Sequence, residues 1–217
     1  MPKNLAIGIL ALQGDYEAHA RALARLGLTA ERELDALTPP PPLPDALEFS
    51  GHWRLVRAAA DLAGLQGLIL PGGESTTMLK FLEDEPFWRE LGAVVRRRAV
   101  LATCAGVILL AREVGNPPQR SLGILDVAVE RNAYGRQIDS SVRQGKLLGR
   151  DLEMVFIRAP KITAAGPGVE ILATESGLPV LVRQGRLLAA TFHPELSRDL
   201  TLHRYFLDAA AAEDPRA

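Results

Sequence analysis

The sequence has a single cysteine among its 217 residues, and it has no hydrophobic run that approaches the roughly 20 apolar residues of a membrane-spanning helix. One cysteine, Cys104, excludes an intramolecular disulfide framework and is typical of proteins in a reducing compartment. The formal net charge is only −1, so the basic excess that attracts nucleic acid or anionic membranes is missing. We therefore expect neither a nucleic-acid nor a membrane partner.

A secretory signal is also not expected. The apolar segment at residues 5–12 is short, the polar sequence Gln13-Gly14-Asp15 follows it directly, and a convincing small-residue cleavage site is missing. We therefore expect a soluble, cytoplasmic protein. A chain of this length with 47% hydrophobic residues suits one substantial domain, which we predict to span residues 1–217.

In the first half of the chain, apolar runs alternate with segments of helical spacing. The runs at residues 5–12, 65–70 and 99–103 predict strands buried on both faces. Helices are predicted over residues 15–26, from a cap at Ser75 or Thr76 to residue 82, and over residues 86–98. This alternation indicates a three-layer α/β fold with a mostly parallel central sheet.

The second half is richer in strands, which we predict at residues 122–130, 153–157, 169–173, 179–184 and 187–192. A hairpin turn at residues 184–186 joins the last two, so the sheet should carry an antiparallel extension. An amphipathic helix is predicted over residues 197–212. A surface insert is expected at about residues 34–53, because the proline run within residues 38–45 suits an extended surface loop and no regular element.

Cys104 lies between a predicted strand and an apolar helix, with the small residues Ala102 and Gly106 two positions away on either side. This pattern is typical of a nucleophile elbow, a strained turn that leaves no room for larger side chains. A thiol there lies at a helix N-terminus, where unpaired N–H groups favour the thiolate. The alternative is that Cys104 is a small buried hydrophobic residue, as most free cysteines are.

His193 is the candidate base, because it directly follows a predicted strand and precedes Pro194-Glu195. Residues two apart in extended backbone project to the same side, so Glu195 can approach the imidazole and fix its tautomer. The alternative is a partly exposed histidine beside an unrelated glutamate. The other three histidines are weaker candidates: His19 and His203 lie within predicted helices, and His52 falls in the insert.

Two further features follow predicted strands, where open parallel sheets place their sites. Gly72-Gly73 lets the backbone approach a developing oxyanion, although a simple tight turn explains it as well. A phosphate-binding loop is disfavoured because the Gly-Lys-Ser/Thr ending is missing. Arg131, Arg136 and Arg158 are candidates to bind a carboxylate, or else solvated surface charges.

Six blocks of sequence carry a resemblance that covers nearly the whole chain. They are Leu-Gln-Gly at 12–14, Pro-Gly-Gly-Glu-Ser-Thr-Thr-Met at 71–78, Thr-Cys-Ala-Gly at 103–106, Arg-Asn-Ala-Tyr-Gly-Arg-Gln at 131–137, Phe-Ile-Arg-Ala-Pro at 156–160 and His-Pro-Glu-Leu at 193–196. Together they resemble the glutaminase subunits of two-component pyridoxal 5′-phosphate synthases, which are class I glutamine amidotransferases of flavodoxin-like fold. The cysteine and His-Pro-Glu motifs are typical of class I glutamine amidotransferases in general. The first two blocks are typical of the glutaminase subunits in particular.

The resemblance implies hydrolysis of L-glutamine to L-glutamate and ammonia by a triad of Cys104, His193 and Glu195, with an oxyanion hole at Gly72 and Gly73. It implies no metal and no cofactor. It also implies that the ammonia passes to a barrel-shaped synthase subunit, in an assembly of twelve subunits of each kind, with Gln13 at the interface. The implied glutamine-binding residues are Gly73, Glu74, Ser75, Arg131, Ile157 and Arg158.

The chain departs from the family pattern at Ala102, where glycine is usual, and in the length of its insert. Neither departure removes a catalytic group. Two other functions stay open at this point: a free-standing thiol hydrolase of the peptidase or γ-glutamyl hydrolase type, and a catalytically silent scaffold.

Overall fold

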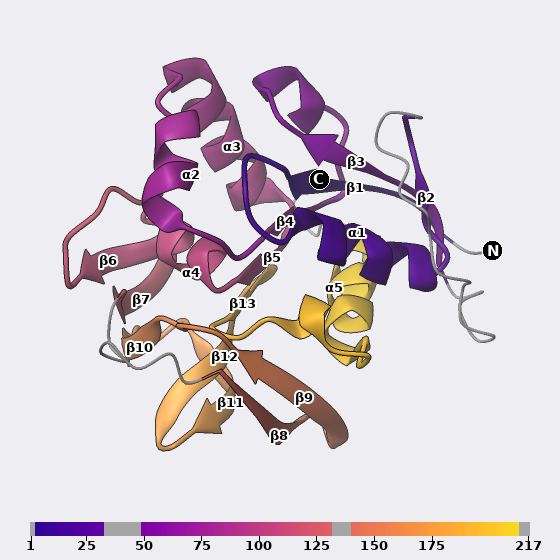
Figure 1. Ribbon diagram of the computed structural model, residues 1–217. Helices are drawn as coiled ribbons and strands as arrows, with labels where there is room; N and C mark the ends of the chain where they lie inside the picture. The colour runs from indigo at the N-terminus through magenta and orange to yellow at the C-terminus, as the bar shows by residue number, and fades with distance from the viewer. Residues whose placement is uncertain (1–2, 33–48, 132–139, 213–217) are drawn as a thin grey trace.

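The computed structural model describes residues 3–32, 49–131 and 140–212 (Figure 1). Within these residues, eight strands form one sheet through the centre of the molecule. In chain order they are Lys3–Leu10 (β1), Thr29–Ala30 (β2), Phe49–Val56 (β3), Gly67–Leu70 (β4), Ala99–Thr103 (β5), Glu170–Glu175 (β11), Leu178–Gln184 (β12) and Leu187–Ala190 (β13).

The strand order is β11-β12-β13-β5-β4-β1-β3-β2. All pairs from β13 to β2 are parallel, whereas β11, β12 and β13 pair antiparallel. The predicted mostly parallel sheet with an antiparallel extension is therefore confirmed. The predicted hairpin is present as well, because Gln184 pairs with Leu187 across the turn between β12 and β13.

Helices cover both faces of this sheet, which gives the predicted three layers (Figure 1). On one face lie α1 and α5, and on the other lie α2, α3, α4 and the short 3₁₀ helix η3. Their bounds are Tyr16–Arg25 (α1), Ala59–Leu62 (η3), Ser75–Phe81 (α2), Glu85–Arg97 (α3), Ala105–Leu110 (α4) and Thr201–Ala211 (α5), with a second 3₁₀ turn at Pro194–Leu196 (η4). No helix in the described part of the chain combines the length and apolarity needed to span a membrane.

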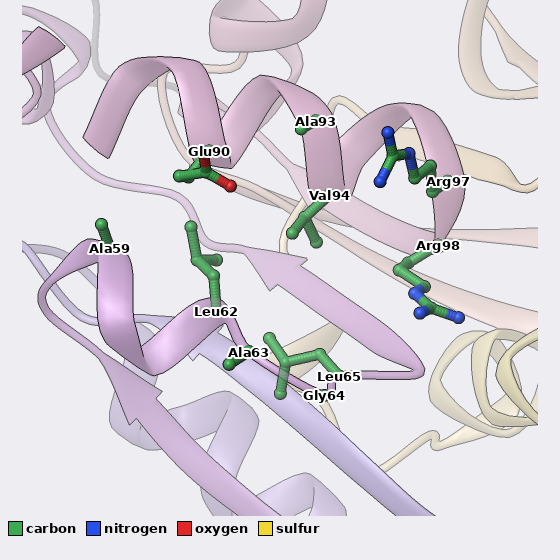
Figure 2. A pocket seen from close by; sticks show the side chains of 10 residues that line it. All are labelled: Ala59, Leu62, Ala63, Gly64, Leu65, Glu90, Ala93, Val94, Arg97 and Arg98. Carbon is green, nitrogen blue, oxygen red and sulfur yellow. The ribbon is translucent and has the colours of Figure 1, made fainter. Parts of the chain in front are cut away.

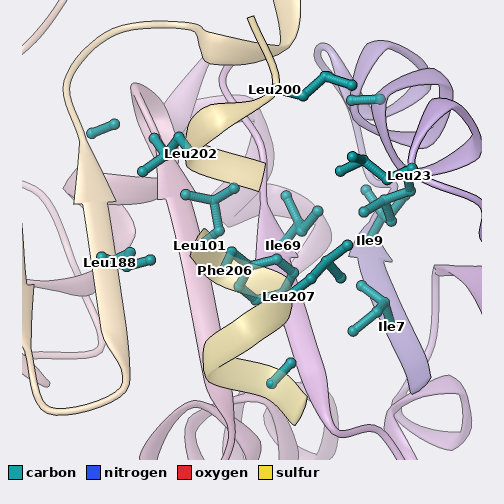
Figure 3. Packing of buried hydrophobic residues seen from close by; sticks show 14 of the residues in the cluster. Ile7, Ile9, Leu23, Ile69, Leu101, Leu188, Leu200, Leu202, Phe206 and Leu207 are labelled. Carbon is teal, nitrogen blue, oxygen red and sulfur yellow. The ribbon is translucent and has the colours of Figure 1, made fainter. Parts of the chain in front are cut away.

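The core below α1 and α5 shows why the strands are apolar throughout. Strands β1, β4, β5 and β13 each direct aliphatic side chains to this face, where Phe206 and Leu207 of α5 pack against them (Figure 3). The alternate residues of the same strands pack under α3 and α4 on the other face. Burial on both faces requires continuous apolar runs, which is the pattern that revealed these strands in the sequence.

Five strands lie outside the main sheet. Ala111–Gly115 (β6), Leu125–Glu130 (β7) and Lys161–Ala165 (β10) form a small sheet of order β10-β7-β6. Ser141–Leu147 (β8) and Arg150–Phe156 (β9) form an antiparallel pair. Of these, only β7 and β9 were predicted, and both with shifted ends.

Two sequence predictions are wrong. Residues 49–53, which we assigned to a surface insert, begin β3, and β3 pairs with β1 over eight residues in the main sheet. The cap of α2 is also neither Ser75 nor Thr76: it is Glu74, whose carboxylate accepts from the backbone N–H groups of Thr76 and Thr77. The proline run at residues 38–45 lies outside the described residues.

The turn between β5 and α4 explains the small residues around the cysteine. Cys104 has a φ of 46°, in the left-handed region that non-glycine residues seldom occupy. A Cβ at Gly106 would collide with the carbonyl oxygen of Leu70 on β4. Ala102, in contrast, is fully buried among the apolar side chains under α3 and α4, which accommodate its methyl group.

We expect Gly106→Ala to destabilise the protein by about 3 kcal/mol or more, because the new methyl group meets backbone, which cannot rotate away. The midpoint of urea unfolding measures the change. Gly168→Ala is the matched control, since a Cβ there meets no atom within 4 Å and should change stability by less than about 1 kcal/mol. Equal midpoints for the two variants would contradict the close approach of α4 to β4.

Candidate active site

Cys104 and His193 meet because β5 and β13 are parallel neighbours in the centre of the sheet. Ala190 pairs with Thr103, and the backbone N–H of Cys104 donates to the carbonyl of Ala190 at 2.9 Å. Both strands therefore end at the same edge of the sheet. Strand β5 leads into the turn at Cys104, and β13 leads into the turn at η4. Cys104 and His193 are 6% and 3% exposed, so the pair is shielded from bulk water.

The Glu195 carboxylate contacts Nδ1 of the His193 imidazole. Its Oε1 lies 2.8 Å from Nδ1 of His193, and its side chain is fully buried. This hydrogen bond leaves Nε2 of His193 free to exchange a proton with the thiol. A second carboxylate, Asp15, approaches the same Nδ1 at 3.5 Å but is partly open to solvent. Together these groups have the geometry of nucleophile, base and orienting acid.

The electrostatics favour a charged imidazole. Burial by itself lowers the pKa of His193, but hydrogen bonds and charge interactions with Cys104 and Glu195 outweigh it and raise the pKa to about 10. Burial raises the pKa of Glu195, and the hydrogen bond from His193 opposes that rise. The Glu195 carboxylate and the His193 imidazolium thus stabilise each other, because burial would favour the neutral form of each group on its own.

Gly72 lies against both reacting side chains. A Cβ at this position would collide with Cε1 of His193 and would lie 3.3 Å from the Cβ of Cys104. Gly73 follows with a φ of 138°, and its neighbour Glu74 is bound on both sides by Gln13: Glu74 N–H donates to Oε1 at 3.1 Å, and Nε2 donates to the Glu74 carbonyl at 3.0 Å. The loop therefore places backbone directly at the thiol.

A pocket of about 390 Å³ opens over the cysteine. Arg131 lines it with a side chain that is 10% exposed and lies 3.8 Å from Glu74, and its Nε has no hydrogen-bond partner among the described residues. The hydroxyl of Ser75 donates to Gln119 at 2.9 Å. Of the residues selected from the sequence, those that line this pocket are Gln13, Gly73, Glu74, Ser75, Cys104, Arg131, Ile157, Arg158 and His193.

The family model for SNO glutamine amidotransferases matches residues 9–212, which is most of the chain. This chain therefore belongs to the SNO glutamine amidotransferase family. A relative from Koribacter versatilis, named pyridoxal 5'-phosphate synthase subunit PdxT, is 46% identical over 94% of both chains. The protein of the same name from Thermus thermophilus is 47% identical over 94% of this chain and 97% of its own.

The crystal structure of a glutamine amidotransferase has the same fold, with a TM-score of 0.78 and 43% identity over 95% of this chain and 99% of that chain. The resemblance stated from the sequence blocks is thus confirmed at the level of family and fold. Membership of the SNO family does not favour the two alternatives, a free-standing thiol hydrolase or a silent scaffold.

Two selected residues do not line the pocket, and one cannot be placed. Glu195 is buried behind His193, and Gly72 is buried against Cys104 and His193. Arg136 is outside the described residues. A second pocket, of about 330 Å³ between η3 and α3, contains none of the selected residues (Figure 2).

The sequence analysis missed three buried polar residues that adjoin the triad. His19, His203 and Thr103 are all 0% exposed and lie behind Glu195. We had set both histidines aside because each lies within a helix. The available signal was that His19 and His203 interrupt the apolar faces of helices that cover a buried sheet, where a polar side chain needs a partner.

Proposed function

We propose that Cys104, His193 and Glu195 hydrolyse the side-chain amide of L-glutamine. The observation that carries the proposal is the position of the His193 imidazole, held between a buried carboxylate at 2.8 Å and the elbow thiol at the base of a pocket, where these contacts raise its pKa to about 10. A base held in this way can exchange a proton with the attacking thiol and the departing group. The SNO family membership of the chain supports the choice of glutamine as substrate.

In the first half of the reaction, the Cys104 thiolate attacks the side-chain carbonyl carbon of glutamine, and the carbonyl becomes an oxyanion beside Gly72 and Gly73. The His193 imidazolium then donates its proton to the amide nitrogen, so ammonia departs and a glutamyl thioester forms. In the second half, water attacks the thioester while His193 accepts its proton. Glutamate leaves and the thiolate is restored.

The remaining pocket residues suit the polar ends of glutamine. Arg131 offers a buried Nε with no partner among the described residues, which matches the substrate's α-carboxylate. Glu74 has its carboxylate engaged in capping α2, whose hydrogen bonds overcome the effect of burial and lower its pKa to about 2. We therefore propose that Glu74 contacts glutamine through its backbone and not through its carboxylate. The full set proposed for glutamine is Gly73, Glu74, Ser75, Arg131, Ile157 and Arg158.

The ammonia passes to a synthase partner in this proposal. Relatives at 46% and 47% identity are named as subunits of pyridoxal 5'-phosphate synthase, so we propose that this chain is the glutaminase subunit of that enzyme. A barrel-shaped synthase subunit in a twelve-plus-twelve assembly, an interface at Gln13, a single domain over residues 1–217 and a cytoplasmic location complete the proposal. No metal or cofactor of its own enters the mechanism.

Ammonia release from glutamine, measured with and without the purified synthase subunit, tests this function. We expect turnover that rises at least about 10-fold when the synthase subunit is added, because the product must be delivered to it. Equal turnover without the partner would instead indicate a free-standing hydrolase. No turnover under either condition would indicate a scaffold.

A further inference from the structure

Two buried histidines, His19 of α1 and His203 of α5, lie behind the triad without a part in the mechanism above. Nδ1 of His19 lies 3.0 Å from Nε2 of His203. Nε2 of His19 lies 3.2 Å from Oγ1 of Thr103 and 3.4 Å from Oε2 of Glu195, the carboxylate oxygen that His193 does not use. A continuous polar contact therefore runs from α5 through α1 to the back of the triad.

Both histidines are neutral. Burial, followed by the charges of His203 and His193, lowers the pKa of His19 well below its usual value. Burial also lowers the pKa of His203 to about 4, with Asp199 and Arg25 as the charged groups that face it. Each ring consequently carries one N–H, and the direction of the hydrogen bonds depends on which nitrogen holds it.

The groups around the two rings decide which histidine donates the hydrogen bond between His19 and His203. If His19 carried its proton on Nδ1, a lone pair would face the Glu195 carboxylate, and His203 would hold a buried Nδ1–H. Nδ1 of His203 has no partner among the described residues, and a bare acceptor there costs less than a stranded donor. The proton of His19 is therefore on Nε2, and His203 donates to Nδ1 of His19.

We propose that His19 is a positioning residue for this enzyme: its Nε2–H donates to Oε2 of Glu195 and so holds the carboxylate in the orientation that His193 needs. The proposal rests on the triad proposed above. In this structure Nε2 of His19 is hydrogen-bonded to Oγ1 of Thr103 at 3.2 Å, whereas Oε2 of Glu195, at 3.4 Å from the same nitrogen, has no hydrogen-bond partner among the described residues. Catalytic hydrogen bonds are commonly long in the free enzyme and shorten in the substrate complex.

Oε2 of Glu195 makes no hydrogen bond to any described residue in this structure, and Nε2 of His19 faces it at 3.4 Å. Closing that contact would give the buried carboxylate a donor on each oxygen. Without His19, the buried Oε2 of Glu195 would lose the N–H group that faces it, and the carboxylate would hold a proton more tightly. A less ionised Glu195 stabilises the imidazolium of His193 less. The effect of His19 therefore reaches the reacting thiol through two other side chains.

His19→Leu and His19→Gln form a matched pair of variants. Leucine fills the site but donates nothing, whereas glutamine ends in a donor and an acceptor that can replace both ring nitrogens. With the synthase subunit present, we expect His19→Leu to lower kcat for glutamine hydrolysis by about 10- to 100-fold with KM changed less than about 3-fold. His19→Gln should stay within about 5-fold of the native kcat.

The pH profile separates positioning from a packing defect. In His19→Leu the pKa of His193 falls, so the alkaline limb of kcat/KM should move to lower pH by about half a unit or more. A mere loss of folded protein lowers the rate equally at every pH. Among the described residues, the titratable groups that face His19 are His203 from α5 and His193 and Glu195 beside η4. His193 itself faces Cys104, Glu195 and Asp15, which are the same in the native protein and the variant.

Thr103→Val tests whether Glu195 is the partner of the His19 Nε2–H group. The substitution removes the Thr103 hydroxyl, which competes for that N–H, and leaves His19 in place. We expect its kcat to be at least that of the native protein. A loss equal to that of His19→Leu would overturn the proposal, as would a native kcat and pH profile in His19→Leu. If His19→Leu does not fold, His203→Leu serves in its place, because it removes the donor to Nδ1 of His19 and should lower kcat, whereas the amide of His203→Gln can still donate and should preserve kcat. A native kcat in both variants would overturn the proposal.

A failure of the triad itself gives a different result. If Cys104→Ala retained activity, the proposed active site would be wrong, whatever the His19 variants do. If Cys104→Ala is inactive and His19→Leu behaves as the native protein, only the positioning role is lost.

Discussion

Cys104→Ala should lower glutamine hydrolysis on the order of 10⁵-fold, measured as glutamate release in the presence of the synthase subunit. The Cys104 thiol is the pocket nucleophile that contacts the imidazole of His193, and loss of the nucleophile in acyl-transfer enzymes leaves only the contribution of binding and the oxyanion hole. The alanine methyl group occupies the same buried position, so the fold and the pocket should persist.

The single cysteine makes the control simple. Iodoacetamide should modify one thiol per native chain and none in Cys104→Ala, and prior incubation with a glutamine analogue should protect that thiol. Unfolding midpoints within about 1 kcal/mol of each other would exclude a folding defect. Residual activity of the variant above about 1% would mean that another group attacks the amide.

His193→Gln should lower the same activity on the order of 10⁴-fold, because no other group can pass the proton from the thiol to the departing ammonia. In the native enzyme the pKa of His193 is raised to about 10. The imidazolium is therefore the main form at neutral pH and is lost as the pH rises through about 10. We expect kcat/KM to hold from neutral pH to about pH 10 and to fall above it.

His52→Gln is the matched control for this substitution. His52 lies on β3, is 31% exposed in its side chain and faces Glu31 at 3.4 Å, away from the pocket. The His52→Gln substitution should leave kcat and the pH profile unchanged. An alkaline limb near the ordinary histidine pKa in the native enzyme would contradict the raised pKa of His193.

The proposed nucleophile and base could be selected from the sequence because each lies within a few residues of the end of a buried strand. A strand buried on both faces is a continuous apolar run, so its end is visible where polar or small residues begin, as at Cys104 and His193. Parallel strands also bring their carboxyl ends to one edge. The strand β3 was missed because Phe49–Val56 includes His52 and Arg54 and follows a proline run, so its pattern is not continuously apolar.

The sequence by itself therefore determined the fold class, the elbow at Cys104 and the pairing of His193 with Glu195, since these depend on neighbours within a few residues. Only the tertiary structure decided that Asp15 approaches His193, that Gln13 binds the backbone of Glu74, and that His19 lies against Glu195. His19 and His203 are 184 residues apart. The packing of α1 and α5 on the same face of the sheet brings them together, and no local pattern in a single sequence records which helix faces will meet.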